Sequence, residues 1–142
     1  MKALIDTCVV IDLLQKREPF FDDAYRVFIC AACDRFEGAV SAKSVTDIYY
    51  IMHRFFHDDA RSRKALETLF KLFSVLDTTG LDCRKALLSP AADYEDALMI
   101  ETAVSFGMDC IITRNERDYS TSPLPVYSPS GFLNIRDSEE GV

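Results

Sequence analysis

The chain alternates short apolar runs with segments of helical apolar spacing, and this alternation restricts the possible folds more than any other feature. The short runs lie at residues 3–5, 38–41, 75–76, 110–113 and 125–127. Apolar residues recur every three or four positions, as on one face of a helix, in residues 7–14, 22–36, 44–56, 60–73 and 93–106. Strands separated by helices build a parallel sheet, because each parallel connection must cross back over the sheet. The pattern predicts an α/β fold with a parallel sheet of about four to five strands and helices on both faces.

Length and composition fit a single domain. The chain has 142 residues, 49% of them hydrophobic and 27% charged, which is sufficient to bury a core. The longest uninterrupted apolar run, residues 27–33, is far shorter than the ~20 residues of a membrane span. Five cysteines, an odd number, favour free thiols and a cytoplasmic location. We expect one domain over residues 1–135, an acidic tail over residues 136–142 and no membrane association.

The charge argues against a protein that binds nucleic acid through a basic surface. The net charge is −7 at pH 7 and the pI is about 4.8, whereas nucleic-acid-binding domains are normally basic. An enzyme whose carboxylates hold divalent cations stays compatible with this composition, because the bound ions reverse the local charge.

Four aspartates lie where predicted strands end or predicted helices begin, namely Asp6, Asp47, Asp96 and Asp118. Ligands of parallel sheets bind beyond the carboxyl ends of the strands, so these side chains could converge there. Clustered carboxylates raise one another's pKa unless a cation lies between them, and all-oxygen ligation suits Mg²⁺ or Mn²⁺. Such ions can activate water and stabilise the leaving oxygen of a phosphodiester. Taken singly, each aspartate is also explained as a helix cap, a helix-dipole acid or a turn residue.

Four segments resemble the sequence motifs of PIN-domain nucleases. Residues 3–12 read ALIDTCVVID, similar to the first motif, in which an apolar strand is followed by Asp-Thr/Ser-Asn and an apolar helix. Residues 40–49 (VSAKSVTDIY) resemble the second motif and residues 93–98 (DYEDAL) the third. Residues 110–119 (CIITRNERDY) are similar to the fourth, of the form Ile-Ile-Thr-Arg-Asn-x-x-Asp-Phe. Residues 126–133 resemble the closing strand and short helix, so the likeness extends over nearly the whole chain in the family's order.

The resemblance implies a PIN-like domain and a hydrolase activity. Members of this kind are Mg²⁺- or Mn²⁺-dependent endoribonucleases, in which water attacks phosphorus in line and leaves a 5′-phosphate. Many small members are VapC-like toxins of bacterial toxin–antitoxin pairs. The implied partners are therefore an RNA substrate and an antitoxin protein.

The resemblance also assigns roles to individual residues. The catalytic positions are Asp6, Asp47, Asp96 and Asp118, and the metal ligands among them are Asp6, Asp96 and Asp118. Thr113 and Asn115 would orient ligands or the scissile phosphate. Asp93, three residues before Asp96 on the same helix face, would support the site from outside without touching the metal.

Two positions depart from the family's pattern. The second motif usually presents Glu, and Asp47 is one methylene shorter, so we expect it to reach a metal through a water molecule. Cys8 replaces the usual Asn and removes an amide that could donate to the acidic site. These departures leave open an alternative, a catalytically weak PIN-like module that binds RNA or a protein partner without cutting. A receiver- or phosphatase-like protein with Asp6 as nucleophile is disfavoured, because the second Asp of that pattern is absent at position 8.

Two further patterns suggest metal or redox chemistry but have simpler explanations. Cys30 and Cys33 form a CxxC without a second pair inside an apolar helical run, which predicts core thiols rather than a redox or zinc site. His53 and His57 lie four residues apart, but the Glu of a zinc-protease motif is missing between them.

Residues 61–64 (RSRK), with Arg54 and Lys71, form the one basic segment. It is either a solvated helix face or a groove for the RNA backbone. Tyr49 and Tyr50 are predicted to make core or dimer contacts rather than to stack on bases. The phenylalanines Phe55, Phe56, Phe70 and Phe73 provide more aromatic surface than one small core requires, so we expect a homodimer.

Overall fold

A five-stranded parallel sheet forms the centre of the computed structural model, which describes residues 1–141. Its strands are β1 (Lys2–Ile5), β2 (Glu37–Ser41), β3 (Ser74–Leu76), β4 (Cys110–Ile112) and β5 (Val126–Tyr127). They lie in the order β3-β2-β1-β4-β5, and every neighbouring pair is parallel. The first strand of the chain is therefore the central one, and the predicted parallel sheet is confirmed.

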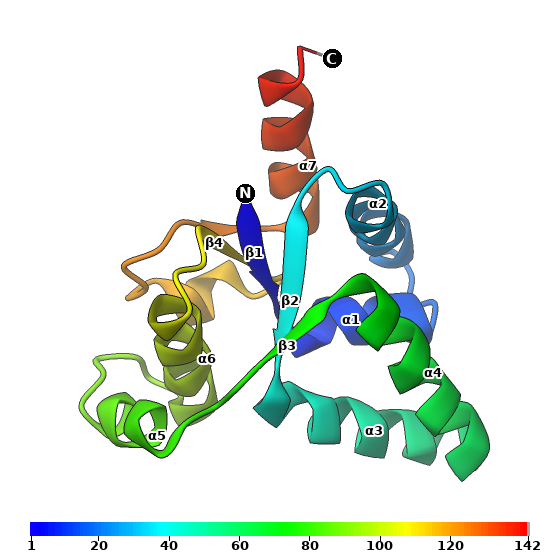
Figure 1. Cartoon of the computed structure of the whole chain (residues 1–142), viewed down its shortest axis with the longest axis horizontal. Helices are drawn as coiled ribbons and strands as arrows, with labels where there is room; N and C mark the ends of the chain where they lie inside the picture. The colour runs from blue at the N-terminus through cyan, green and yellow to red at the C-terminus, as the bar shows by residue number, and fades with distance from the viewer. Residues whose placement is uncertain (142) are drawn as a thin grey trace.

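Seven α-helices and one 3₁₀ turn surround the sheet within the described residues. They are α1 (Thr7–Leu14), α2 (Phe21–Ala32), α3 (Ala42–Phe56), α4 (Asp59–Leu72), α5 (Gly80–Leu87), α6 (Tyr94–Ser105), η1 (Glu116–Tyr119) and α7 (Pro129–Glu139). In Figure 1, α5 and α6 lie on one side of the sheet, while α1, α2 and α4 lie on the other. The predicted covering of both faces is confirmed.

The apolar runs of the strands are continuous because both faces of the sheet are buried. Ala3, Leu4 and Ile5 of β1 are all fully buried. Leu4 packs with residues of α6, whereas Ala3 and Ile5 pack in a separate, larger cluster with residues of α1 and α2. Successive side chains of the strand thus enter two different cores, as the two-residue period of a strand requires.

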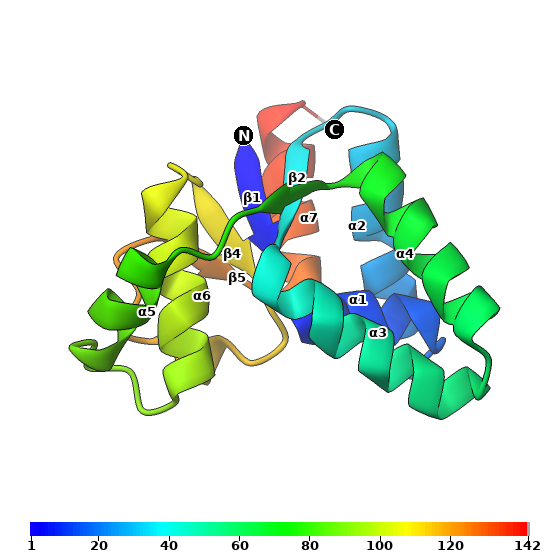
Figure 2. The ribbon, with the colours of Figure 1, turned by 60° about the horizontal axis from the view of Figure 1, so that its bottom comes forward.

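The carboxyl ends of β1 and β2 pass directly into helices. Asp6 is the N-cap of α1, and Ser41, the last residue of β2, caps α3 by accepting a hydrogen bond from the Ser44 backbone N–H at 3.1 Å. Figure 2 shows α3 starting at the end of β2, with α6 to its left and α4 to its right. The helix N-termini and the polar residues that cap them consequently lie at one edge of the sheet.

Gly38 in β2 allows the ring of Phe73 to lie closer to the strand than any larger residue would permit. A Cβ atom at this position would lie 2.4 Å from the ring of Phe73. Phe73 in turn packs edge-to-face on Phe28 of α2, with ring centroids 4.8 Å apart. The prediction that Phe73 adds to an aromatic surface is therefore wrong, because its ring fills the core above β2.

Two helices differ from the sequence prediction. No helix was predicted at α5, although Thr79 and Asp82 form a capping box at its start. The predicted domain boundary at residue 135 lies inside α7, which continues to Glu139. Arg35 pairs with Asp137 at 3.0 Å and with Glu140 at 2.6 Å. Of the predicted tail, residue 142 lies outside the described residues.

Within residues 1–141, no helix has the length and apolar character needed to cross a membrane.

Candidate functional site

The side chain of Asp6 is fixed by contacts from two segments. Its Oδ1 accepts a hydrogen bond from the Thr7 backbone N–H at 2.8 Å, and its Oδ2 accepts one from the Thr113 hydroxyl at 2.7 Å. The Asp6 backbone N–H donates to the carbonyl of Ile112 at 2.9 Å. The carboxylate is thus held between the ends of β1 and β4, the central strand of the sheet and one of its neighbours.

Asp96 lies in the first turn of α6, close to three other carboxylates. Asp93 caps this helix by accepting a hydrogen bond from the Asp96 backbone N–H at 3.0 Å. Burial, together with the negative charges of Asp93, Asp6 and Asp118, raises the pKa of the Asp96 carboxyl to about 6. The fold therefore brings Asp6, Asp96 and Asp118 near enough for their charges to interact.

Thr113 links the fourth sequence motif to Asp6. Its side chain is fully buried, and its hydroxyl accepts a hydrogen bond from the Asn115 backbone N–H at 3.0 Å while it donates to Asp6. Asn115 is exposed and precedes η1, and the backbone N–H of Asp118 donates to its carbonyl at 2.9 Å. Asn115 thus contributes a backbone donor that orients Thr113.

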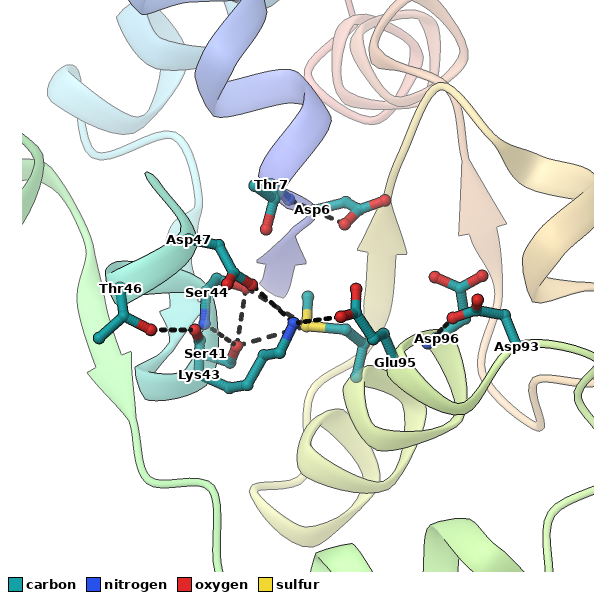
Figure 3. A network of polar contacts seen from close by, with 11 residues as sticks. Asp6, Thr7, Ser41, Lys43, Ser44, Thr46, Asp47, Asp93, Glu95 and Asp96 are labelled. Carbon is teal, nitrogen blue, oxygen red and sulfur yellow. Dashed lines mark hydrogen bonds and ion pairs between the residues drawn. The ribbon is translucent and has the colours of Figure 1, made fainter. Parts of the chain in front are cut away.

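Asp47 has a cationic partner that the sequence analysis did not predict. The ammonium of Lys43, one turn earlier on α3, lies 2.6 Å from Asp47 Oδ2. The same ammonium lies 3.3 Å from Glu95 Oε1 on α6. Figure 3 shows Lys43 reaching from α3 toward Glu95, so that one lysine joins two acidic residues of different helices.

A cavity of about 450 Å³ lies between α3 and α6 at this edge of the sheet. Its charged lining residues are Asp6, Lys43, Asp47, Arg54, Glu95 and Asp96. Three of the four predicted aspartates line it, and Asp118 affects it through the electrostatic interaction with Asp96. The cavity combines carboxylates with two cationic side chains, an arrangement suited to binding both a cation and a phosphate.

The carboxylates fit a hard divalent cation, although they are not gathered tightly. Within residues 1–141, no group of three or more His, Cys, Asp and Glu side chains is close enough to hold a metal ion. Asp6 and Asp96 offer only oxygen donors, the ligands that Mg²⁺ and Mn²⁺ prefer. Burial and then repulsion from neighbouring carboxylates raise the pKa of Asp96, and a bound cation would relieve the repulsion.

Cys8 lies where the family's pattern has an amide. Its Sγ is 3.5 Å from Asp6 Oδ2 and 3.7 Å from the hydroxyl oxygen of Thr113. Burial and the negative charge of Asp6 raise the pKa of the Cys8 thiol to about 11. The thiol is neutral at physiological pH and is a weaker hydrogen-bond donor to Asp6 than an amide would be.

The sequence analysis missed Tyr119, the last residue of η1. Its ring is 2% exposed and packs with Leu4 of β1 and Met99 of α6. Its hydroxyl is buried, with no hydrogen-bond partner among the described residues. Burial and the charges of Asp6 and Asp96 raise the pKa of Tyr119. The signal was present in the sequence, because the family's fourth motif ends in Phe and this chain adds a hydroxyl there.

A second missed contact joins Asp12 of α1 to Arg114. Asp12 is 1% exposed, and both Nε and Nη2 of Arg114 donate to its carboxylate, Nη2 at 3.1 Å. The guanidinium also lies 4.0 Å from the ring centroid of Phe20. Arg114 therefore neutralises a buried carboxylate and orients the chain that follows Thr113.

The remaining cysteine and histidine patterns are structural. Cys30 is buried in α2, but Cys33 is exposed, so the prediction of a core thiol is wrong for Cys33. The helix ends at Ala32, and this places Cys33 at its C-cap. His53 stacks on Tyr49, with ring centroids 5.8 Å apart.

The basic segment of α4 is largely paired with acids. Arg63 pairs with Asp59 at 2.8 Å, and Lys64 and Lys71 lie 3.3 Å and 3.9 Å from Glu67. Arg61 lies over the ring of Phe56. These contacts favour a solvated helix face over a groove for the RNA backbone.

Solved structures with the same fold include a toxin–antitoxin complex and a toxin. VapBC2 from Rickettsia felis, bound to a DNA fragment from its promoter, has a TM-score of 0.69 and 14% identity, covering 89% of this chain and 97% of that chain. A toxin–antitoxin complex from Klebsiella pneumoniae has a TM-score of 0.66 and 23% identity, with the same coverage of 89% and 97%. VapC20 from Mycobacterium tuberculosis, described as a toxin that cleaves the sarcin–ricin loop, has a TM-score of 0.61 and 16% identity, covering 77% and 86%. At sequence identities this low, the similarity shows a shared fold and does not by itself show a shared activity.

No curated protein matches this sequence significantly. The model of the PIN domain matches residues 2–117, which include β1, the cavity between α3 and α6, and the strand that precedes Thr113. By this match, the chain belongs to the PIN domain family.

Proposed function

We propose that this protein is an endoribonuclease that depends on Mg²⁺ or Mn²⁺ and hydrolyses RNA phosphodiesters. The observation that carries the proposal is that Asp6 and Asp96 line one cavity at the edge of a PIN-domain sheet, where burial and the charges of Asp93, Asp6 and Asp118 raise the pKa of Asp96. A half-buried carboxylate in a cavity whose pKa is raised by burial and by neighbouring like charges, as that of Asp96 is, supports a functional site at this position.

Asp6 and Asp96 would hold the cation, with Asp118 approaching from η1. When bound, the cation supplies activation of water and neutralisation of charge on the phosphodiester. Thr113 keeps the Asp6 carboxylate in place through its 2.7 Å hydrogen bond, and Asp93 fixes the first turn of α6 that carries Asp96. Asp47 acts through Lys43 in this arrangement rather than directly on the cation.

The proposed substrate is RNA, and the proposed partner is an antitoxin. Lys43 and Arg54 provide positive charge inside the cavity, where a phosphate of the substrate can approach. The solved neighbours support the assignment, since VapC20 is described as cleaving the sarcin–ricin loop and the others as toxin–antitoxin complexes. A bacterial toxin of this kind would act on RNA in the cytoplasm and be held inactive by its partner.

The test is RNA cleavage by the purified chain with a matched pair of variants. Structured RNAs, including ribosomal and transfer RNAs, are incubated with Mn²⁺, with Mg²⁺ and with a chelator. We expect metal-dependent cleavage that Asp6→Asn abolishes and Asp22→Asn leaves intact, because Asp22 is an exposed residue of α2 away from the cavity. Cleavage that persists with the chelator or in Asp6→Asn would refute the proposal.

The second candidate is a PIN module that binds RNA or a protein without cutting. It is favoured by the partnership of Asp47 with Lys43 and by the weak donor Cys8 beside Asp6. The same experiment separates the two functions, because a binding module retains RNA in a filter-binding assay and yields no cleaved product with either metal.

A further inference from the structure

The cavity already contains a positively charged side chain, that of Lys43. Asp47 on α3 and Glu95 on α6 face the same ammonium, that of Lys43, at 2.6 Å and 3.3 Å (Figure 3). The Lys43 side chain is 27% exposed and lines the cavity together with both carboxylates. A lysine that joins two helices in this way occupies the position between their acidic groups.

We propose that Lys43 takes the place of a second divalent cation, so that the cavity binds one divalent cation, on the side of Asp6 and Asp96. This inference rests on the proposed metal-dependent function and specifies how many ions that function uses. Enzymes that cut phosphodiesters with two metals hold them ~3.5–4 Å apart between shared carboxylates. Here the Lys43 ammonium contacts the carboxylates of Asp47 and Glu95, which would otherwise be free to bind a second ion.

Helix energetics alone do not account for a lysine at this position. Lys43 is the second residue of α3, where the partial positive charge of the helix N-terminus disfavours a cation. The order Lys before Asp at a spacing of four residues is also the less favourable orientation for a helical ion pair. Lys43 has a further partner outside α3, the carboxylate of Glu95 on α6 at 3.3 Å.

The ammonium remains charged in this environment. Partial burial acts to lower the pKa of Lys43, but the hydrogen bonds and charges of Asp47 and Glu95 outweigh burial and raise it. The lysine is thus a permanent cation at neutral pH, available to neutralise a phosphate that enters the cavity.

The inference is tested by the number of Mn²⁺ ions bound, measured by isothermal titration calorimetry on the full chain. We expect one Mn²⁺ per wild-type chain and two per chain of Lys43→Met, in which the side chain stays unbranched, is one atom shorter and loses its charge. Lys43→Arg and Lys64→Met should each bind one, since the first keeps the cation and the second changes an exposed residue of α4. Adding Glu95→Gln to Lys43→Met should remove the second ion again.

Each result has a definite consequence. Two Mn²⁺ ions in the wild type, or one in a folded Lys43→Met, would overturn the role of Lys43 and leave the metal-dependent function standing. No Mn²⁺ bound to the wild type would overturn the proposed function itself. If circular dichroism shows that Lys43→Met does not fold, the wild-type number and the Lys43→Gln variant, measured in the same way, decide the question.

Discussion

The hydroxyl of Thr113, at the end of β4, donates a 2.7 Å hydrogen bond to the carboxylate of Asp6, at the end of β1. The Thr113 side chain is fully buried, and the Asn115 backbone N–H donates to the same hydroxyl. These two bonds use the hydroxyl as acceptor and donor at once, which fixes its direction. The carboxylate of the first motif is therefore oriented by the fourth, across two strands that are adjacent in the sheet.

Replacing Thr113 with Val removes this hydrogen bond with little change of shape. We expect a loss of ~1.5–3 kcal/mol in the free energy of unfolding, the usual value for a hydrogen bond to a charged group. RNA cleavage should fall by ~10–100-fold, as expected when a partner that orients a metal ligand is lost. Thr113→Ser retains the hydroxyl and is the control in both urea unfolding and cleavage assays. A loss in Thr113→Ser without a loss in Thr113→Val would show that the methyl packing, not the hydrogen bond, is responsible, because Val keeps the methyl group and Ser keeps the hydroxyl.

Asp6→Asn should abolish cleavage and stabilise the metal-free protein. Asn caps a helix about as well as Asp, so α1 should keep its start. The lost negative charge removes one of the charges that raise the pKa of Asp96, and the repulsion falls accordingly. We expect a higher Tm in chelator, by roughly 2–4 °C for each kcal/mol of repulsion relieved. Mn²⁺, which should raise the Tm of the wild type, should not raise that of Asp6→Asn. An unchanged Tm in chelator would mean that the repulsion relieved is no larger than the stabilisation lost with the charged hydrogen bond from Thr113.

The pH dependence of stability should reveal Asp96. The pKa of the Asp96 carboxyl is about 6 in the folded chain, above its ordinary value of 3.8, so the native state binds a proton more readily than the unfolded state. The contribution of Asp96 to stability is therefore greatest below pH 4 and is lost as the pH rises from about 4 to 6. We expect Asp96→Asn to gain stability relative to the wild type across this range, as measured by melting in chelator. A constant difference between the two proteins from pH 4 to 7 would contradict the raised pKa.

The class of fold was predictable because a sheet that is buried on both faces has strands with unbroken apolar sequences. A strand such as β1, whose residues enter two cores, reads as an unbroken apolar run, and the helices between such runs indicate parallel connections. Helix α5 left no such trace, since Leu81, Leu87 and the following Leu88 are exposed. Its start is set by the capping box of Thr79 and Asp82, a local signal that apolar spacing does not detect.

The candidate site was only partly predictable. Positions at strand ends indicated Asp6 and Asp118, because topology alone brings such residues to one edge. The pairing of Lys43 with Glu95 depends on the relative placement of α3 and α6, which no spacing within the chain encodes. The same holds for Asp12 and Arg114, which are far apart in sequence and meet only because β1 lies beside β4.

That buried pair provides a test of stability that is independent of the cavity. Arg114→Met would leave the carboxylate of Asp12 buried without its cation, a change that typically costs ~3–5 kcal/mol. Asp12→Asn together with Arg114→Met removes both charges and should be less destabilising than the single variant. Arg117→Met, at an exposed position of η1, should change the free energy of unfolding by less than ~0.5 kcal/mol. Urea unfolding of the three variants measures these differences, and a double variant as unstable as the single one would show that the Asp12 charge is not the cause.

Tyr119 combines a closely packed ring with a buried polar hydroxyl near the acidic residues. Its ring fills the core between β1 and α6, whereas its buried hydroxyl has no partner among the described residues. A buried hydroxyl without a hydrogen bond costs ~1–3 kcal/mol, so Tyr119→Phe should raise the free energy of unfolding in chelator by about 1 kcal/mol while the ring packing is retained. Tyr50→Phe is the matched control, because Tyr50 is 64% exposed and its hydroxyl can be solvated. A lower stability of Tyr119→Phe would instead identify the hydroxyl as a stabilising donor to Asp6 or Asp96, and urea unfolding at pH 7 decides between the two signs.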